Sequence, residues 1–267
     1  MLLQGNTLTL GGAAASTFSG VMSGSGVLVK NGLSALTLSG SNSFSGGVRL
    51  SAGALQAGSN LALGSGTLVF TGGTLSVESV FERALANRLV LSGSLVVGDA
   101  RNYGLLNLGG SAALVADTAL TVASQVKLGG VVSGTANLSK TGTGELILAG
   151  SNTFSGTTTV SSGILTLAGG SALADSMALT LGAAGTLTLS ASEQIASIAG
   201  AGQIRLETST LTLSGGTSTT YTGVIRGASG TLVKTGTAVL TLTGNNSFGA
   251  GVKLSGGAIQ LGTNTAL

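Results

Sequence analysis

The stretch Leu36–Leu50, LTLSGSNSFSGGVRL, returns twice more in this chain with little change. The second copy, LILAGSNTFSGTTTV, begins at Leu146, and the third, LTLTGNNSFGAGVKL, begins at Leu240, so the copies start 110 and 94 residues apart. A phrase that recurs within one chain is the signature of a repeat architecture, in which each unit packs against its neighbours. The repetition therefore favours a long surface over a single pocket as the functional part of the molecule.

A short leader precedes each copy at the same offset. It reads LVKNG from Leu28, LSKTG from Leu138 and LVKTG from Leu232. Residues 8–64 also align with residues 211–267 nearly end to end, with a single inserted residue. The pattern at the end of the chain thus returns to the phase of its beginning after about 204 residues.

The dominant local pattern is an apolar, a polar and an apolar residue, followed by Gly or Ser. Examples are LTL from Leu8, LNL from Leu106 and LTL from Leu187. Alternation with a period of two predicts short β-strands with one buried face, and Gly supplies the turn conformations at their ends. A β-sandwich accepts strands this short, but it does not explain a phrase that returns about a hundred residues later.

We therefore predict an all-β chain that forms a parallel β-helix, in which each coil of roughly 20 residues pairs with the next at about 4.8 Å. The chain then holds about 13 coils in a rod roughly 60 Å long. Residues 79–88, SVFERALANR, offer one alternative, a short helical excursion, since their apolar residues lie near helical spacing. The residues expected to point into the core include Leu36, Leu38, Leu146, Leu148, Leu240 and Leu242.

We expect a single solenoid segment of a longer repeat array, over residues 1–267, with repeat phrases at residues 26–55, 134–165 and 230–259. Residues 1–10 and 258–267 continue the Leu-x-Leu pattern and have no polar cap. Solenoids normally carry such caps, because an end coil otherwise leaves its flat face and its strand edges unpaired. The expectation is that the parent array continues in register, or that copies stack head to tail into a filament.

The composition limits the chemistry that this chain can perform. It has no His and no Cys, which excludes a Ser-His-Asp triad, a Cys nucleophile and a His- or Cys-bound metal site. Among the few carboxylates only Glu78 and Glu82 are close in sequence. The net charge of +3 is spread thinly, without a basic cluster, so no nucleic-acid partner is expected. We predict no enzymatic activity, no catalytic, cofactor-binding or metal-ligating residues, and no cofactor.

Two sets of polar residues recur at fixed places in the repeat. An Asn stands two residues before each Phe, where it is either part of a ligand stripe or, as we favour, a cap for backbone groups at an αL turn beside a Phe that fills the coil corner. The leader Lys is expected to lie at the solvated end of its strand. These residues are Asn42, Asn152 and Asn246, Phe44, Phe154 and Phe248, and Lys30, Lys140 and Lys234.

The least regular stretch, Glu78–Tyr103, is rich in charge. One interpretation is a loop or side patch that contacts a partner. The other, which we favour, is a charged turn that keeps the solenoid soluble and blocks wrong strand pairing. The charged residues concerned are Glu78, Glu82, Arg83, Arg88, Asp99 and Arg101.

Leader and phrase together resemble a known family repeat, the autotransporter-associated β-strand repeat, also called the passenger-associated transport repeat. The usual form of the family repeat is L-x-K-x-G, then L-x-L-x-G-x-N-x-Y/F-x-G, then G-x-L, and Phe stands in all three copies here where Tyr is commoner in the family. The resemblance covers Gly26–Leu55, Gly134–Leu165 and Gly230–Ile259.

The resemblance implies a right-handed parallel β-helix passenger of a type V secretion protein, displayed extracellularly on the outer-membrane surface of a Gram-negative bacterium. It implies a stalk, an adhesin or a self-associating fibre, with self-association, head-to-tail assembly, and host or matrix glycans or proteins as candidate partners. Contact with the membrane is expected only through a translocator domain outside this segment. The alternatives are the passenger of a pore-forming or vacuolating toxin and, third, a polysaccharide-degrading β-helix enzyme.

Overall fold

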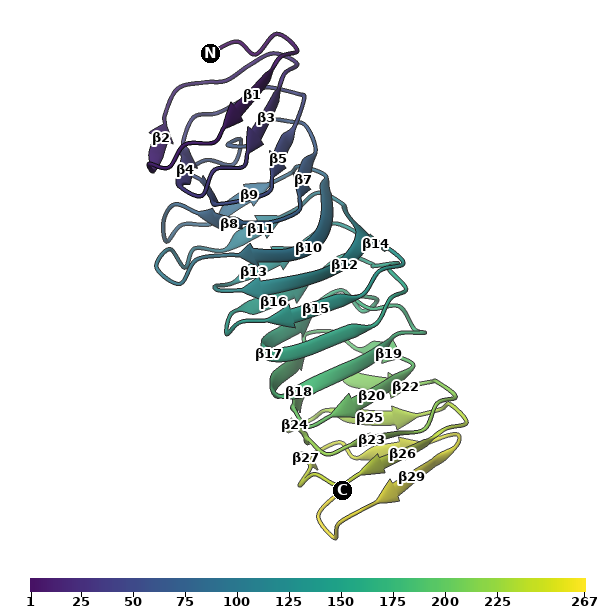
Figure 1. Cartoon of the computed structure of the whole chain (residues 1–267). Helices are drawn as coiled ribbons and strands as arrows, with labels where there is room; N and C mark the ends of the chain where they lie inside the picture. The colour runs from purple at the N-terminus through teal and green to yellow at the C-terminus, as the bar shows by residue number, and fades with distance from the viewer.

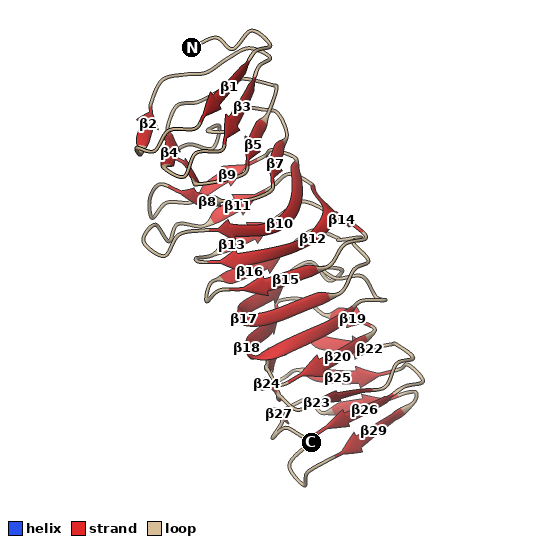
Figure 2. Ribbon diagram, viewed as in Figure 1, coloured by secondary structure: helices blue, strands red, loops and turns tan.

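The fold is a solenoid built only of strands and turns. A computed structural model describes all of residues 1–267 and contains 29 strands and no helix (Figure 2). Every strand pairing is parallel, and the chain winds through about 13 coils, so that the two termini lie at opposite ends of the rod (Figure 1). The predicted fold class, an all-β parallel β-helix, is confirmed.

Each coil has three faces, which the chain crosses in the same order. The first face holds β1 (Thr7–Leu10), β3 (Val27–Lys30), β5 (Val48–Leu50), β7 (Leu68–Phe70), the starts of β10 (Leu89–Val97) and β12 (Ala112–Val122), β14 (Val132–Gly134), β19 (Glu193–Ile195), β22 (Thr210–Leu213), β25 (Thr231–Lys234) and β28 (Val252–Leu254). The second face holds β2 (Ser16–Phe18), β4 (Ala35–Leu38), β6 (Ala54–Ala57), β8 (Thr74–Val77), the ends of β10 and β12, β15 (Leu138–Thr141), the starts of β17 (Thr158–Leu167) and β18 (Ala178–Leu189), β20 (Ser197–Gly200), β23 (Thr219–Tyr221), β26 (Val239–Leu242) and β29 (Ala258–Leu261). The third face holds β9 (Arg83–Leu85), β11 (Leu106–Leu108), β13 (Val126–Leu128), β16 (Glu145–Leu148), the ends of β17 and β18, β21 (Gln203–Arg205), β24 (Val224–Gly227) and β27 (Ser247–Phe248).

Some strands turn a corner of the coil without a loop. In β10 the bend lies at Gly93, with a φ of 79°, and in β17 it lies at Gly163, with a φ of 72°. The pairing register shifts just before each glycine, between Leu91 and Gly93 in β10 and between Val160 and Ser162 in β17. Glycine adopts this left-handed backbone without a steric penalty, so one residue can redirect the strand from one face to the next.

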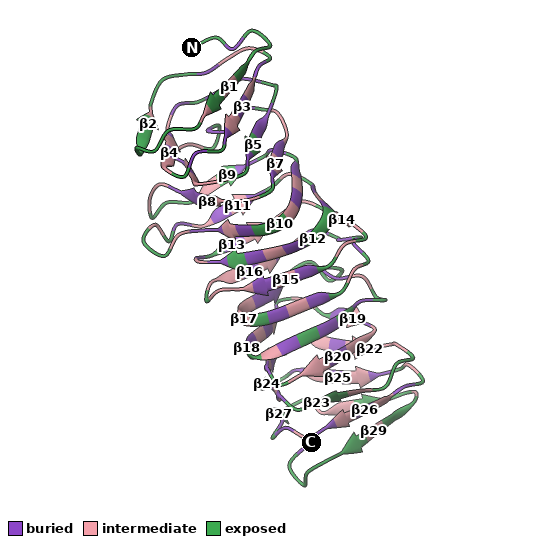
Figure 3. Cartoon of the chain, in the orientation of Figure 1, coloured by how far each residue is buried: buried purple, intermediate pink, exposed green.

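One continuous core of 56 buried residues fills the rod. Inward and outward residues alternate along the strands, which Figure 3 shows as bands on β10, β12, β17 and β18. The alternation follows from the period of two in the sequence. The six leucines predicted to point inward, Leu36, Leu38, Leu146, Leu148, Leu240 and Leu242, are all buried.

The second copy of the repeat lies one face further around the coil than the other two. Its leader strand at Leu138 belongs to the second face, whereas the leaders at Leu28 and Leu232 belong to the first face. Between the first and third leaders the chain makes about ten coils of roughly 20 residues, which returns the pattern to the same face. The same sequence pattern therefore forms two different corners of the rod.

The suggested helical excursion over residues 79–88 is wrong. This stretch contains the strand β9, in which Leu85 is buried and Arg83 N donates to Leu105 O at 3.0 Å. The parallel neighbour β11 satisfies the backbone groups of β9 in register, and a helical turn would break that ladder. No helix in this structure is long and apolar enough to span a lipid bilayer.

Candidate functional site

The three leader lysines lie inside the rod, and the prediction of solvated strand ends is wrong. Lys30, Lys140 and Lys234 are all buried. The physical reason is the period of two, which places each Lys on the same side of its strand as the core leucine two residues earlier. The sequence carried this signal in the spacing Leu-x-Lys.

The ammonium group of each lysine binds carbonyl oxygens at the coil corner. Lys140 Nζ donates to Gly142 O at 3.2 Å in its own coil and to Ser162 O at 2.9 Å in the next coil. Lys30 Nζ donates to Gly32 O and, at 3.4 Å, to Ala52 O, which repeats the arrangement. Lys234 Nζ donates to Gly236 O in its own coil. Lys30 and Lys140 therefore tie successive corners together, and none of the three lysines faces a ligand.

Burial lowers the pKa of all three lysines. The pKa of Lys140 falls to about 8 because burial penalises the charged ammonium, and those of Lys30 and Lys234 fall for the same reason.

The repeat asparagines also bind backbone groups, and each one links three coils. Asn152 Oδ1 accepts from Val132 N in the preceding coil at 2.7 Å, and its Nδ2 donates to Ala172 O in the following coil at 2.7 Å. Asn42 and Asn246 make the equivalent pairs of bonds. The predicted capping role is confirmed, but none of the three has a left-handed backbone, so the αL part of the prediction is wrong.

The three asparagines are buried, with Phe44 and Phe154 fully buried beside them and Phe248 partly so. These residues belong to the interior of the rod and form no exposed ligand stripe.

Two further buried polar residues support corners of the rod and were missed in the sequence. Glu193 accepts from Ala172 N at 3.1 Å and Leu173 N at 2.9 Å, and Asn87 Nδ2 donates to Gly66 O at 2.7 Å. Burial raises the pKa of Glu193, and the nearby Asp175 adds to the effect, while the two N–H donors oppose it. The alternation of Glu193 with the core residue Ile195 was the available signal.

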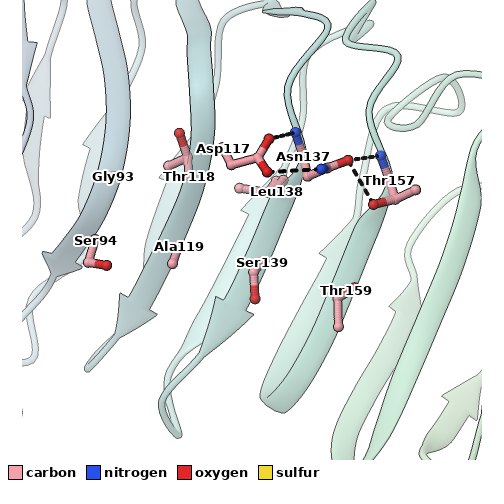
Figure 4. Close-up of a pocket in the computed structure, with 10 residues that line it drawn as sticks. All are labelled: Gly93, Ser94, Asp117, Thr118, Ala119, Asn137, Leu138, Ser139, Thr157 and Thr159. Carbon is pink, nitrogen blue, oxygen red and sulfur yellow. Dashed lines mark hydrogen bonds between the residues drawn. The ribbon is translucent and has the colours of Figure 1, made fainter.

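A shallow hollow of about 210 Å³ lies beside the second face (Figure 4). Along its edge Asn137 donates from N and Nδ2 to the two carboxylate oxygens of Asp117, at 3.0 and 3.1 Å, and Asn137 Oδ1 accepts from Thr157 N and Oγ1 at 2.8 Å. The bonds from Asn137 lower the pKa of Asp117. Because these polar atoms bond to one another, the row acts as a ladder between coils and not as a reactive site.

Within the irregular stretch Glu78–Tyr103, two loops on neighbouring coils stack on each other, and β9 and β10 lie between them in sequence. We define the side loops as residues 78–82 and 98–104. Gly104 N donates to Ser79 O at 3.3 Å, and a Cβ on Gly104 would lie 2.3 Å from Phe81 O. This close approach requires glycine and brings the two loops together.

The side loops carry the two exposed aromatic residues of the chain. Phe81 and Tyr103 are each 68% exposed, and the neighbouring Val80 is 50% exposed. Asp99 orders the second loop, since its carboxylate accepts from Arg101 N at 2.8 Å and Asn102 Nδ2 at 3.3 Å. The side loops thus present an apolar centre on an ordered backbone.

Charged groups surround that centre. Arg83 and Glu78 form the one ion pair of the structure, at 3.8 Å, and Glu82 Oε1 accepts from Asn107 Nδ2 at 3.0 Å. An apolar centre with a polar rim is the usual anatomy of a protein-binding surface. The structure places no group of three or more carboxylates close enough to hold a metal ion.

Comparison with known proteins agrees with this architecture. The family model described as the passenger-associated-transport-repeat matches residues 28–57, 138–167 and 232–261. The chain is also similar to the adhesin BmaC autotransporter of Brucella suis biovar 1 (strain 1330), at 35% identity over 288 aligned positions that cover 97% of this chain. The chain spans 8% of the length of that relative. No solved structure matches the chain.

Proposed function

Because this chain carries the passenger-associated-transport-repeats of autotransporter passengers, we propose that it is an adhesive stalk segment displayed on the outer surface of a bacterium. The observation that carries the proposal is the contrast between an unbroken rod and one ordered protrusion. The core is continuous over the length of the chain, and the exposed aromatic side chains gather on the side loops alone. In this proposal the rod holds the side loops away from the cell surface, and the side loops bind the partner.

The similarity to an autotransporter adhesin supports the adhesive role. The proposal includes no catalytic activity, because the chain has no His or Cys and its carboxylates are dispersed. No observation favours the passenger of a pore-forming toxin or a polysaccharide-degrading enzyme. That this rod is one segment of a longer array, and that copies associate head to tail, stay predictions.

The partner at the side loops is proposed to be a host or matrix protein. Aromatic residues dominate the binding energy of protein interfaces when they lie at the centre of a patch with a polar rim. Phe81 and Tyr103 meet that description, and the surrounding Glu82, Asp99 and Arg101 supply the rim.

The test is to display the full protein on bacterial cells with Phe81→Ser and Tyr103→Ser together, and to count attachment to surfaces coated with host cells or matrix proteins. We expect attachment to fall by about tenfold or more, because an interface anchor is lost. The matched control is Leu33→Ser, which removes an 87% exposed apolar side chain elsewhere on the rod and should change nothing. Equal attachment by the double variant and the unaltered protein would overturn the role of the side loops.

A further inference from the structure

Two arginines stand side by side on the third face without a neutralising partner. Arg205 in β21 and Arg226 in β24 are direct partners in the parallel register, and both are exposed. Neither forms an ion pair, since the single ion pair of the structure joins Arg83 and Glu78. Like charges on neighbouring strands repel each other, and an anion bound between the two arginines would relieve that repulsion.

The two guanidinium groups border a hollow of about 310 Å³. Its lining is entirely polar or glycine, with Gln203, Arg205, Glu207, Arg226 and Gly227. Gln203 Oε1 accepts from Arg205 Nε at 2.9 Å, which orients that guanidinium. No intramolecular hydrogen bond engages the outer nitrogens of either arginine, so both remain available as donors to a ligand.

The spacing and the donor geometry identify the chemistry of that ligand. Adjacent strands lie about 4.8 Å apart, so the two arginines can contact one oxyanion or two neighbouring ones. A guanidinium presents a planar fork that matches sulfate and carboxylate oxygens in pairs. The hollow is open and shallow, which suits a segment of an extended polymer.

We propose that Arg205 and Arg226 form a binding site for an acidic polysaccharide, through its sulfate or carboxylate groups. No aromatic side chain lines the hollow, so the stacking platform of single-stranded nucleic-acid sites is missing, and the basic surface is limited to one pair. The site is separate from the side loops, and its existence does not depend on their role in adhesion.

Glu207 sets a limit on what the site accepts. It lines the same hollow, holds a left-handed backbone with a φ of 53°, and forms no ion pair with either arginine. Its negative charge repels an anion that approaches from that side. Replacing it by glutamine removes this repulsion while the two guanidinium groups stay in place, so Glu207→Gln should tighten binding.

The test measures binding of the chain to heparin, as the sulfated probe, and to polygalacturonate, as the carboxylated probe, at low and physiological salt. The double variant Arg205→Gln/Arg226→Gln should lose about tenfold or more in affinity, because two charge-assisted contacts disappear. The matched control is Arg49→Gln/Lys253→Gln, which removes the same charge from exposed positions on the first face. The control variant should lose less than about twofold in affinity for either probe at physiological salt, where distant charges are screened.

Binding of either probe through the arginine pair supports the site and identifies which oxyanion it takes. An equal loss of affinity in the two double variants would show that binding depends only on net charge, and this result would overturn the site. Retention of heparin and polygalacturonate affinity in Arg205→Gln/Arg226→Gln would overturn it as well. Single-stranded DNA that bound as tightly as either polysaccharide, with the same dependence on the two arginines, would overturn the assignment to a polysaccharide. Unchanged thermal unfolding of all variants serves as the check on folding.

Discussion

Lys140 Nζ lies directly under Gly163 of the next coil, where a Cβ on the glycine would come within 2.6 Å of the nitrogen. The same relationship joins Lys30 and Gly53, again at 2.6 Å, although the two pairs occupy different corners of the rod. A Cβ would come closer still to a backbone oxygen, 2.3 Å from Gly142 O at Gly163 and 2.2 Å from Gly32 O at Gly53, so only glycine fits beside the ammonium group. The glycine also needs its left-handed backbone to turn the corner. Lysine and glycine, 23 positions apart in both pairs, thus form one structural unit.

Replacing Gly163 by alanine should destabilise the rod by about 1–3 kcal/mol, the cost of a left-handed backbone in a residue with a Cβ. The Cβ would also lie 2.3 Å from Gly142 O and 2.6 Å from Lys140 Nζ, and the displacement of these groups adds to the loss. Urea unfolding measures the change. Gly109→Ala is the matched control, because a Cβ there would have no neighbour closer than 3.8 Å and the backbone is not left-handed. Similar losses in both variants would contradict the account of this corner.

The buried charge of Lys140 should make stability depend on pH. The pKa is about 8 in the folded chain and 10.5 as the ordinary value, so the unfolded chain binds more protons between these limits. The contribution of Lys140 to the free energy of unfolding should therefore rise with pH from about 8 to 10.5 and stay constant below this window.

The measurement compares urea midpoints of the unaltered chain and Lys140→Met across that window, because other groups cancel in the difference. Burial raises the pKa of Tyr221, which works in the opposite sense only above its ordinary value of 10.0. A difference between the two proteins that is flat from pH 8 to 10 would show that the ammonium is not desolvated.

Asn152→Ala should cost about 1–3 kcal/mol, because it leaves Val132 N and Ala172 O buried without their partner. Chemical denaturation gives the loss. Asn245→Ala removes the same side chain from an exposed position and should be neutral within about 0.5 kcal/mol. A neutral Asn152→Ala would mean that the link between three coils does not stabilise the solenoid.

Two adjacent residues of β16 test the inward and outward faces. Leu148 is fully buried, so Leu148→Ala should cost about 2–5 kcal/mol through lost burial and the cavity left behind. The neighbouring Ile147 faces outward and is only partly covered, so Ile147→Ala should cost well under half as much. Thermal or urea unfolding measures the loss of stability in each variant. A larger loss in Ile147→Ala than in Leu148→Ala would contradict the assignment of inward and outward residues in β16.

Local patterns in the sequence were sufficient for much of the fold. Leu146 and Leu148 could be assigned to the core, because alternation along a strand is a property of the strand alone. The same rule, applied to the leader, would have placed Lys140 inside. The prediction of a solvated Lys140 fails because the period of two outweighs the ordinary preference of a charged side chain for water.

The sequence by itself determined that this chain is a parallel β-helix, since period-two strands, Gly corners and a phrase that returns along the chain can all be read from the residues. Only the tertiary structure decided which residues become neighbours across coils. Direct partners on neighbouring strands are separated by different numbers of positions. The separation is 21 for Arg205 and Arg226, 20 for Asn107 and Lys127, and 17 for Thr188 and Arg205. Coil length varies because each corner takes up a different number of residues. The face on which a repeat falls, the stacking of the side loops and the pairing of the two arginines all depend on the sum of those lengths.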